Sequence, residues 1–123
     1  MKKQPEKHTE ERPWGRFEQF TANRKSTIKI ITINPGETLS LQYHNLRDEF
    51  WHILQGEPII TIGQDEIVKL ARPGDEFFIP RKTIHRIGAP PNTQLVKFLE
   101  IAFGKFDEED IVRLADNYNR AGV

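Results

Sequence analysis

The stretch PGETLSLQYHNLRDEFWHILQG, residues 35–56, carries the pattern that decides the fold. Between positions 39 and 44, leucine, leucine and tyrosine alternate with serine, glutamine and histidine. Strict alternation is typical of a strand with one face against a core, and side chains two residues apart share a face. Gln42 and His44 are therefore predicted to point the same way, away from Leu41. A polar loop follows, and residues 50–55 are predicted to form the next strand, which ends at Gly56.

The chain on both sides of this stretch repeats the plan of short strands between turn residues. Pro35-Gly36 and Pro73-Gly74 interrupt apolar runs, as proline and glycine do in turns. Further strands are predicted at residues 15–20, 27–33, 58–63, 66–70, 77–80, 84–87 and 94–103. Many short strands at even spacing favour a sandwich or a barrel. The sequence therefore predicts an all-β barrel.

The last residues have a different period. Ile111, Leu114, Ala115 and Tyr118 recur at i, i+3, i+4 and i+7, the spacing of one helix face. Asp107 suits an N-cap, and the acidic residues after it suit the first turn of a helix. A C-terminal helix over about residues 107–119 is therefore predicted to lie against the barrel.

Length and composition limit the classes of protein that this chain can be. It has 123 residues, 37% hydrophobic and 29% charged, which fits one globular domain. Its 18 basic residues balance 18 acidic ones, so charge gives no sign of a nucleic-acid partner. No apolar run approaches the ~20 residues that span a membrane, and no cysteine is present. We expect a flexible arm over residues 1–11, one domain over residues 12–123, and a cytoplasmic protein.

Four side chains with metal-binding chemistry stand at spacings that a barrel can bring together. Gln42 and His44 share a strand face, Glu49 follows five residues after His44, and His85 lies far downstream, after a second turn. Taken alone, such a histidine is more often a surface or hydrogen-bonded residue, and Glu49 suits a solvated loop. Together they form a mixed nitrogen and oxygen set that suits Zn, Mn, Fe, Co or Ni. We therefore predict that these four residues bind a divalent metal ion.

The same residues resemble the two sequence motifs of the cupin superfamily. Residues 36–56 are similar to motif 1, a glycine, a histidine pair, a glutamate and a final glycine, with Gln42 in place of the first histidine. Residues 74–85 resemble motif 2, with Lys82 where the motif has glycine; Ala89 stands where it ends in asparagine. The resemblance implies the double-stranded β-helix, or jelly-roll barrel, of cupins.

A closer resemblance covers residues 12–120, to the C-terminal cupin domain of type II mannose-6-phosphate isomerases, the partner of mannose-1-phosphate guanylyltransferase in bifunctional enzymes. It rests on RPWGRF (12–17), NPGETLSLQYH (34–44), RDEFW (47–51), IPRKTIHR (79–86) and EEDIVRLADNYNR (108–120). The family also carries glutamine at position 42. This chain departs from it at Asn45, Leu46 and Phe50, where members usually carry histidine, and at Asn119, which replaces a glycine.

The resemblance implies an activity and a set of site residues. The family interconverts mannose 6-phosphate and fructose 6-phosphate through an enediol, with a metal that Gln42, His44, Glu49 and His85 would hold. The residues that it implies in catalysis are Arg47, Glu49, His85, Arg113 and Arg120. The residues expected to bind substrate near the same mouth are Lys82, Arg86, Trp51 and His52.

The sequence alone also allows simpler roles for the predicted site residues and other functions for the chain. Arg113 and Arg120 also suit the surface of a helix, and Lys82 and Arg86 suit solvated side chains, while Trp14 is expected to close the barrel. The lost histidines fit a non-catalytic module that binds a sugar phosphate or sugar nucleotide. An open metal face fits another metal-dependent cupin enzyme, such as an iron or manganese oxygenase. Because strands at a barrel edge pair readily, we also expect a homodimer.

Overall fold

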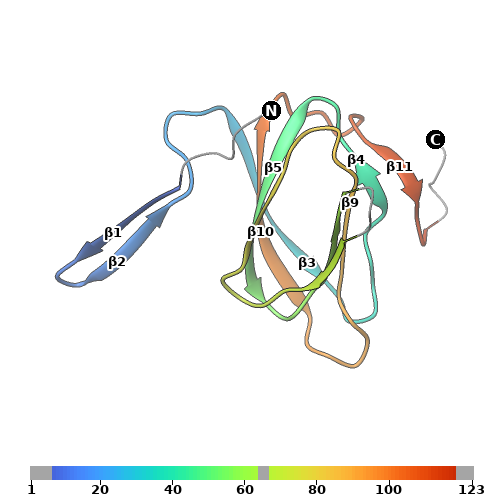
Figure 1. Ribbon diagram of the computed structural model, residues 1–123, viewed down its shortest axis with the longest axis horizontal. Helices are drawn as coiled ribbons and strands as arrows, with labels where there is room; N and C mark the ends of the chain where they lie inside the picture. Colours follow the sequence, from blue (N-terminus) through green and yellow to red (C-terminus); the bar gives the residue numbers. More distant parts are fainter. Residues whose placement is uncertain (1–6, 64–66, 119–123) are drawn as a thin grey trace.

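The computed structural model describes residues 7–63 and 67–118, and all regular elements in that part of the chain are β-strands. They form three antiparallel sheets (Figure 1). A hairpin joins β1 (His8–Arg12) and β2 (Gly15–Gln19). A four-stranded sheet has the order β3 (Ser26–Ile33), β10 (Val96–Gly104), β5 (Arg47–Gln55), β8 (Glu76–Ile79). A five-stranded sheet has the order β11 (Val112–Ala115), β4 (Leu41–Tyr43), β9 (His85–Gly88), β6 (Ile59–Ile62), β7 (Ile67–Leu70).

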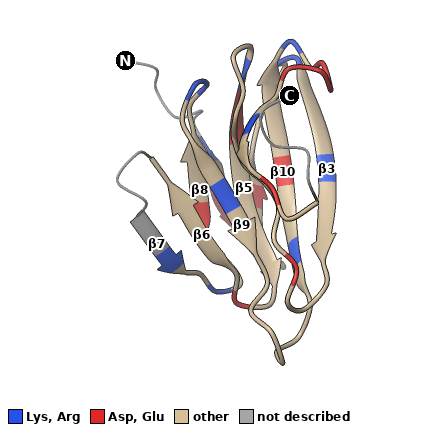
Figure 2. Ribbon diagram, turned by 90° about the vertical axis from the view of Figure 1, so that its right-hand side faces the viewer, with Lys and Arg blue, Asp and Glu red and all other residues tan. Residues whose placement is uncertain are grey.

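The two larger sheets face each other as the walls of a jelly-roll barrel (Figure 2). Alternate residues of each strand point between the walls, as the two-residue period of a strand requires. The core between them includes Trp51, Ile53 and Phe98 of one sheet and Ile60 and Ile87 of the other, all at most 2% exposed. The predicted all-β barrel is confirmed, and each strand predicted from the sequence has a counterpart with ends shifted by a few residues.

Strand β10 shows how the sequence sets the two faces of one wall. Val96, Phe98 and Glu100 occupy alternate positions that face the interior, and all three are buried. In the pairing with β5, Trp51 lies opposite Glu100 and Glu49 lies opposite the next interior residue of β10. The interior of this sheet is therefore apolar at one end and polar at the end where β5 begins.

Gly56 ends β5 in a conformation that favours glycine. Its φ is 84°, in the region that side chains with a Cβ avoid. A Cβ at this position would lie 2.6 Å from the carbonyl oxygen of Leu95. The final glycine of the first motif is thus required by the turn and by its close neighbour.

The predicted C-terminal helix is wrong, because the chain is extended there. Strand β11 pairs antiparallel with β4, with Arg113 opposite Gln42. Without β11, β4 would be an edge strand with unpaired backbone N–H and C=O groups. Pairing with β11 gives these groups hydrogen bonds, which a helix at this place would not provide. Asp107 caps a turn instead, since its Oδ1 accepts a hydrogen bond from the backbone nitrogen of Glu109 at 3.0 Å. The predicted helix end at position 119 lies outside the described residues. The described part of the chain contains no helix long and apolar enough to cross a membrane.

The β1–β2 hairpin stands away from the barrel (Figure 1). Trp14 lies in its turn and is 73% exposed, so the expectation that Trp14 closes the barrel is wrong. The base of the hairpin is fixed to the barrel by an ion pair between Lys7 and Glu76 at 2.7 Å. The predicted arm boundary at residue 11 falls inside β1, and residues 1–6 lie outside the described part, so the arm itself stays a prediction.

Candidate metal centre

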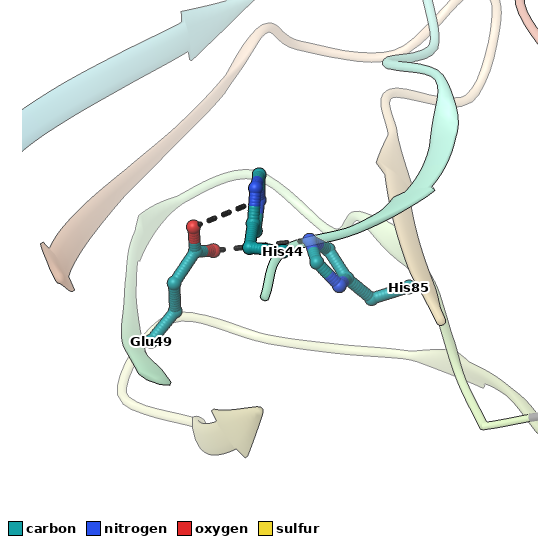
Figure 3. A group of neighbouring side chains, drawn as sticks. All are labelled: His44, Glu49 and His85. Carbon is teal, nitrogen blue, oxygen red and sulfur yellow. Dashed lines mark ion pairs between the residues drawn. The ribbon is translucent and has the colours of Figure 1, made fainter. Parts of the chain in front are cut away.

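Three ionisable side chains meet at the polar end of the barrel (Figure 3). His44 follows β4 and His85 begins β9 in the five-stranded sheet, whereas Glu49 lies in β5 of the four-stranded sheet. One nitrogen or oxygen atom of each lies within 4.8 Å of the others. All three residues are at most 2% exposed. Residues far apart in sequence converge here because the two sheets face each other.

Backbone carbonyl groups fix the rings of both histidines. His44 Nδ1 lies 2.7 Å from the carbonyl oxygen of Asp110, and His85 Nδ1 lies 2.9 Å from that of Thr83. Because a carbonyl only accepts, each Nδ1 donates to it, and the Nε2 atom of each ring is turned toward Glu49. These Nε2 atoms lie 3.2 Å (His44) and 3.9 Å (His85) from oxygens of Glu49, and the buried Nε2 of His85 has no hydrogen-bond partner in the described part of the chain. Outer hydrogen bonds orient imidazole ligands of metals in the same way.

The charges of the centre follow from its burial and its composition. Burial acts to raise the pKa of Glu49, but its hydrogen bond with His44 and the charges of His85, His44 and Arg47 together lower that pKa to about 2. Burial is the main cause that lowers the pKa of His85. At neutral pH the carboxylate of Glu49 is therefore ionised and His85 is neutral, the forms in which both groups bind a metal ion.

Two buried donors orient the carboxylate of Glu49. Arg47 Nε donates to Oε2 and Trp51 Nε1 donates to Oε1, each at 3.0 Å. Arg47 Nη2 also lies 3.3 Å from His44 Nε2. Trp51 thus belongs to the core and supports Glu49, and it offers no exposed ring for a sugar.

Gln42 lies beside this group, directly across β4 and β9 from His85. Its Nε2 lies 3.4 Å from His44 Nε2, and its Oε1 accepts a hydrogen bond from the Ser40 hydroxyl at 2.5 Å. Half a turn of the amide exchanges its two terminal atoms and directs the oxygen toward His44. Two imidazoles, one carboxylate and this amide oxygen fit a divalent ion such as Zn, Mn, Fe, Co or Ni.

The model of one protein family, described as mannose-6-phosphate isomerase C-terminal, matches residues 1–116. The chain belongs to this family. It is 36% identical to a mannose-1-phosphate guanylyltransferase of Escherichia coli (strain K12), over 89% of the chain and 22% of that protein. The xanthan biosynthesis protein XanB of Xanthomonas campestris is also 36% identical, over 89% of the chain and 23% of that protein. The chain spans under a quarter of the length of these relatives.

Solved structures confirm the cupin fold of this family member. A cupin protein from Bacteroides fragilis has a TM-score of 0.58 at 21% identity, over 69% of this chain and 74% of that one. The capsular polysaccharide assembling protein CapF from Staphylococcus aureus has a TM-score of 0.65 at 16% identity, over 89% of this chain and 34% of that one. At such identities the likeness concerns the fold alone.

Arg113 is the predicted cation of the tail that lies next to the centre. Arg113 in β11 is paired with Gln42 in β4, and Gln42 is paired in turn with His85 in β9. The three residues therefore form one row across the sheet. The Nε of Arg113 is buried and has no hydrogen-bond partner among the residues that the structure describes. The other predicted tail cation, Arg120, lies outside the described residues.

Two residues predicted to bind substrate point away from the centre, and a third is exposed beside it. The imidazole of His52 lies 2.7 Å from Glu76 on the outer face of its sheet, and Arg86 donates to the carbonyl of Leu39 at 2.9 Å. Lys82 is exposed in a turn beside the centre, where its backbone nitrogen donates to the carbonyl oxygen of His44 at 2.6 Å. The physical reason is the strand period: His52 and Arg86 each follow an inward-pointing residue, and they therefore point outward.

The positions at which the family usually carries histidine also lie off the centre. Asn45 and Leu46 are exposed, and their backbone nitrogens each donate to the carboxylate of Asp110 at 2.9 Å. Phe50 is buried on the outer face of the barrel, in a cluster with Ile101. The loss of these three histidines therefore leaves the Nε2 atoms and the carboxylate of the centre intact.

Glu100 is a functional candidate that sequence reasoning missed. It is only 7% exposed and faces the interior opposite Trp51. Burial, and next the negative charge of Glu49, raise the pKa of Glu100 to about 7. The signal was present in the sequence, because Glu100 stands at an interior position in the alternation of Val96 and Phe98, where an acid is unusual.

Proposed function

We propose that this chain is a metal-dependent isomerase that interconverts mannose 6-phosphate and fructose 6-phosphate. The observation that carries the proposal is the convergence of an ionised carboxylate and two imidazole Nε2 atoms in one buried centre. A divalent ion held by Gln42, His44, Glu49 and His85 supplies polarisation of the substrate oxygens when it is bound. Membership of the mannose-6-phosphate isomerase C-terminal family supports this choice of substrate.

The reaction moves one proton between neighbouring carbon atoms. A base removes the proton of carbon 2 of the open-chain aldose, and the released electron pair forms the double bond of an enediol while oxygen 1 gains a proton. Carbon 1 then receives a proton, and oxygen 2 loses one to become the ketose carbonyl. Atoms and electrons balance, so the site must supply a base with a pKa near neutrality and an electrophile.

Glu100 is the base that suits this step. With a pKa raised to about 7, it is present in both its proton-accepting and its proton-donating forms at neutral pH. Its burial on the interior face keeps bulk water from competing for the proton. Arg47 holds Glu49 in place, and the guanidinium of Arg113, whose buried Nε has no hydrogen-bond partner among the described residues, suits the anionic phosphate, with Arg120 as a second proposed cation.

Direct turnover tests this proposal. The protein is loaded separately with Zn²⁺, Mn²⁺, Co²⁺, Ni²⁺ and Fe²⁺, and the formation of fructose 6-phosphate from mannose 6-phosphate is measured. We expect turnover that is lost in His44→Ala and kept in Glu76→Gln, whose carboxylate lies on the outer face. If no metal raises turnover above that of His44→Ala, the chain is not this isomerase.

A second candidate is a non-catalytic module that binds a sugar phosphate or sugar nucleotide. The exposed Asn45 and Leu46 favour it, because the side chains at these positions offer no acid or base. The relative from Escherichia coli is named as a guanylyltransferase, which supports a sugar nucleotide as an alternative ligand. Calorimetric binding of mannose 6-phosphate without turnover would favour this function over the isomerase.

We further propose that the chain works in the cytoplasm as a homodimer with a small phosphosugar as its ligand. A phosphosugar and an absence of cysteine both suit that compartment. The mass of the protein in solution and its location in cells test these two points separately from catalysis.

A further inference from the structure

Lys29 stands at an interior position of β3, where the strand pattern favours an apolar residue. Ile33 and Ile31, at the alternate positions that follow it, belong to the core or pack against it. Lys29 extends this alternation, and in the pairing of β3 with β10 it lies opposite Glu100 (Figure 2). It is half-buried, although lysine is among the residues most often exposed. β3 therefore carries a cation into the polar end of the barrel.

The ammonium of Lys29 has an aromatic neighbour but no carboxylate within ion-pair distance. Its Nζ lies 4.6 Å from the ring centre of Phe106, which belongs to the segment that crosses the polar end of the barrel. No carboxylate of the described residues forms an ion pair with Lys29. Glu100 has a pKa of about 7, so at neutral pH it balances this charge only in part. A half-buried ammonium without a full counter-charge is unfavourable, and a bound anion would supply that charge.

Phe106 connects Lys29 with the metal centre. The guanidinium carbon of Arg47 lies 4.8 Å from the centre of the same ring. Arg47 in turn donates to Glu49 at 3.0 Å and lies 3.3 Å from His44. The carboxylate of Glu49 matches the charge of Arg47, whereas Lys29 has no such partner among the described residues. Lys29 is thus a cation one aromatic ring away from the side chains that contact the proposed metal ligands.

β3 and β11 border the same hollow at the side of the barrel. Thr32 and Ile33 of β3 line it together with Tyr118, three residues after β11, and its volume is about 320 Å³. Both strands run from the polar end of the barrel toward this hollow. Lys29 and Arg113 therefore approach it from its two sides, each nearer to the polar end than the residues that line it.

We propose that Lys29 binds the phosphate group of the phosphosugar from the β3 side, with Arg113 on the β11 side. This inference rests on the proposed function. Carbon 6, which carries the phosphate, lies four carbon atoms beyond carbon 2, so the phosphate binds away from the centre while carbons 1 and 2 react. The compact ammonium of lysine is a common partner of phosphate dianions. Lys29 is then a specificity-determining residue, and it takes no part in the proton transfer.

Calorimetry of the metal-free protein tests this site without catalysis. Inorganic phosphate and mannose 6-phosphate are titrated separately, so that binding of the phosphate group alone is distinguished from binding of the phosphosugar. Lys29→Met should weaken the binding of both ~10- to 100-fold, as the loss of a hydrogen bond to a charged group does. Lys29→Arg keeps the charge and should retain most of the affinity. The matched control is Lys97→Met, which removes a half-buried lysine at the other end of the sheet, on its outer face.

Turnover by the metal-loaded protein separates phosphate binding from an effect on catalysis. Lys29→Met should raise KM for mannose 6-phosphate ~10- to 100-fold and change kcat much less. A fall in kcat with unchanged affinity for inorganic phosphate would mean that Lys29 acts on Glu100, and it would overturn the inference. If Lys29→Met does not fold, Lys29→Gln takes its place in both experiments.

The two experiments also separate this inference from the isomerase activity. A wild type that turns over, with Lys29→Met at the same KM and the same phosphate affinity, removes the inference and leaves the proposed function standing. A wild type that binds mannose 6-phosphate through Lys29 without turnover supports the inference and contradicts the isomerase. A wild type that binds neither inorganic phosphate nor mannose 6-phosphate overturns both.

Discussion

Glu49 is surrounded by groups that favour its charge, and this makes it the most sensitive single residue of the centre. Arg47 and Trp51 both donate to it, and His44 lies 3.2 Å away. Glu49→Gln removes the ionised ligand and leaves the buried guanidinium of Arg47 without its counter-ion. We expect affinity for Co²⁺ or Zn²⁺ to fall ~100-fold or more and the free energy of unfolding to fall by about 3 kcal/mol. Calorimetric metal titration and denaturant unfolding measure the two effects.

The control for this prediction is another partly buried carboxylate. Glu76 contacts His52 and Lys7 at 2.7 Å, but it lies on the outer face of the barrel. Glu76→Gln should leave metal affinity unchanged. Equal metal affinity in wild type and Glu49→Gln would mean that the ion binds elsewhere.

Glu100 gives the protein a pH-dependent stability of known sign. Its pKa is about 7 in the folded state and near 4.5 when unfolded, so the folded state binds the proton more tightly. Stability therefore falls as pH rises from about 4.5 to about 7, by on the order of 3 kcal/mol from this group. Four charged or titratable side chains act on the pKa of Glu100. Glu49 raises it, whereas Arg47, Lys29 and His44 lower it.

Comparison of wild type with Glu100→Gln isolates this effect. The variant cannot ionise, so it should equal the wild type near pH 4.5 and exceed it in stability at pH 8. Urea unfolding of the metal-free protein at both values measures the difference. An equal pH dependence in the two proteins would show that Glu100 does not carry it.

At the scale of elements, the segment between β10 and β11 crosses the polar end of the barrel and is held there by Asp110. The Asp110 carboxylate accepts from the backbone nitrogens of Asn45 and Leu46, and its carbonyl fixes His44. Asp110→Ala removes the first two bonds and should cost about 2 kcal/mol of stability. We expect faster hydrogen exchange of these two amides and faster metal release.

The neighbouring Glu109 supplies the control for this segment. Its side chain is exposed, so Glu109→Ala should leave both rates near those of the wild type. Slow exchange of the Asn45 and Leu46 amides in Asp110→Ala would contradict the role given to this carboxylate.

Local patterns predicted the strands well and the tail poorly, and the difference has a physical cause. The turn at Gly56 depends on residues adjacent in sequence, and the alternation that places Gln42 and His44 on one face is also local. The extended state of β11 depends on an open edge of β4 about 70 positions earlier, which overrides the helical spacing of Ile111 and Leu114. The role of Asp110 depends on contacts across the barrel, which spacing along the chain does not reveal, whereas the alternation along residues 96–100 already placed Glu100 at an interior position.

At the scale of the whole molecule, the metal centre links the two walls of the barrel. Glu49 comes from the four-stranded sheet, and His44 and His85 come with the five-stranded sheet. An ion bound by all three binds only the folded protein, so a free concentration of 100 times the dissociation constant should add ~2.7 kcal/mol to stability. For a domain of this size that corresponds to a rise of about 10 °C in melting temperature.

Chelation and one substitution separate this linkage from unspecific binding. Removal of the metal with a chelator should return the wild type to the lower melting temperature, because the walls are then joined at this end by hydrogen bonds alone. His44→Ala should melt at one temperature with or without metal, since the ion loses its ligand next to β4. A metal-induced rise as large in His44→Ala as in the wild type would place the ion outside the centre, and the link between the two sheets would then rest on the contacts of Arg47 with Glu49 and His44.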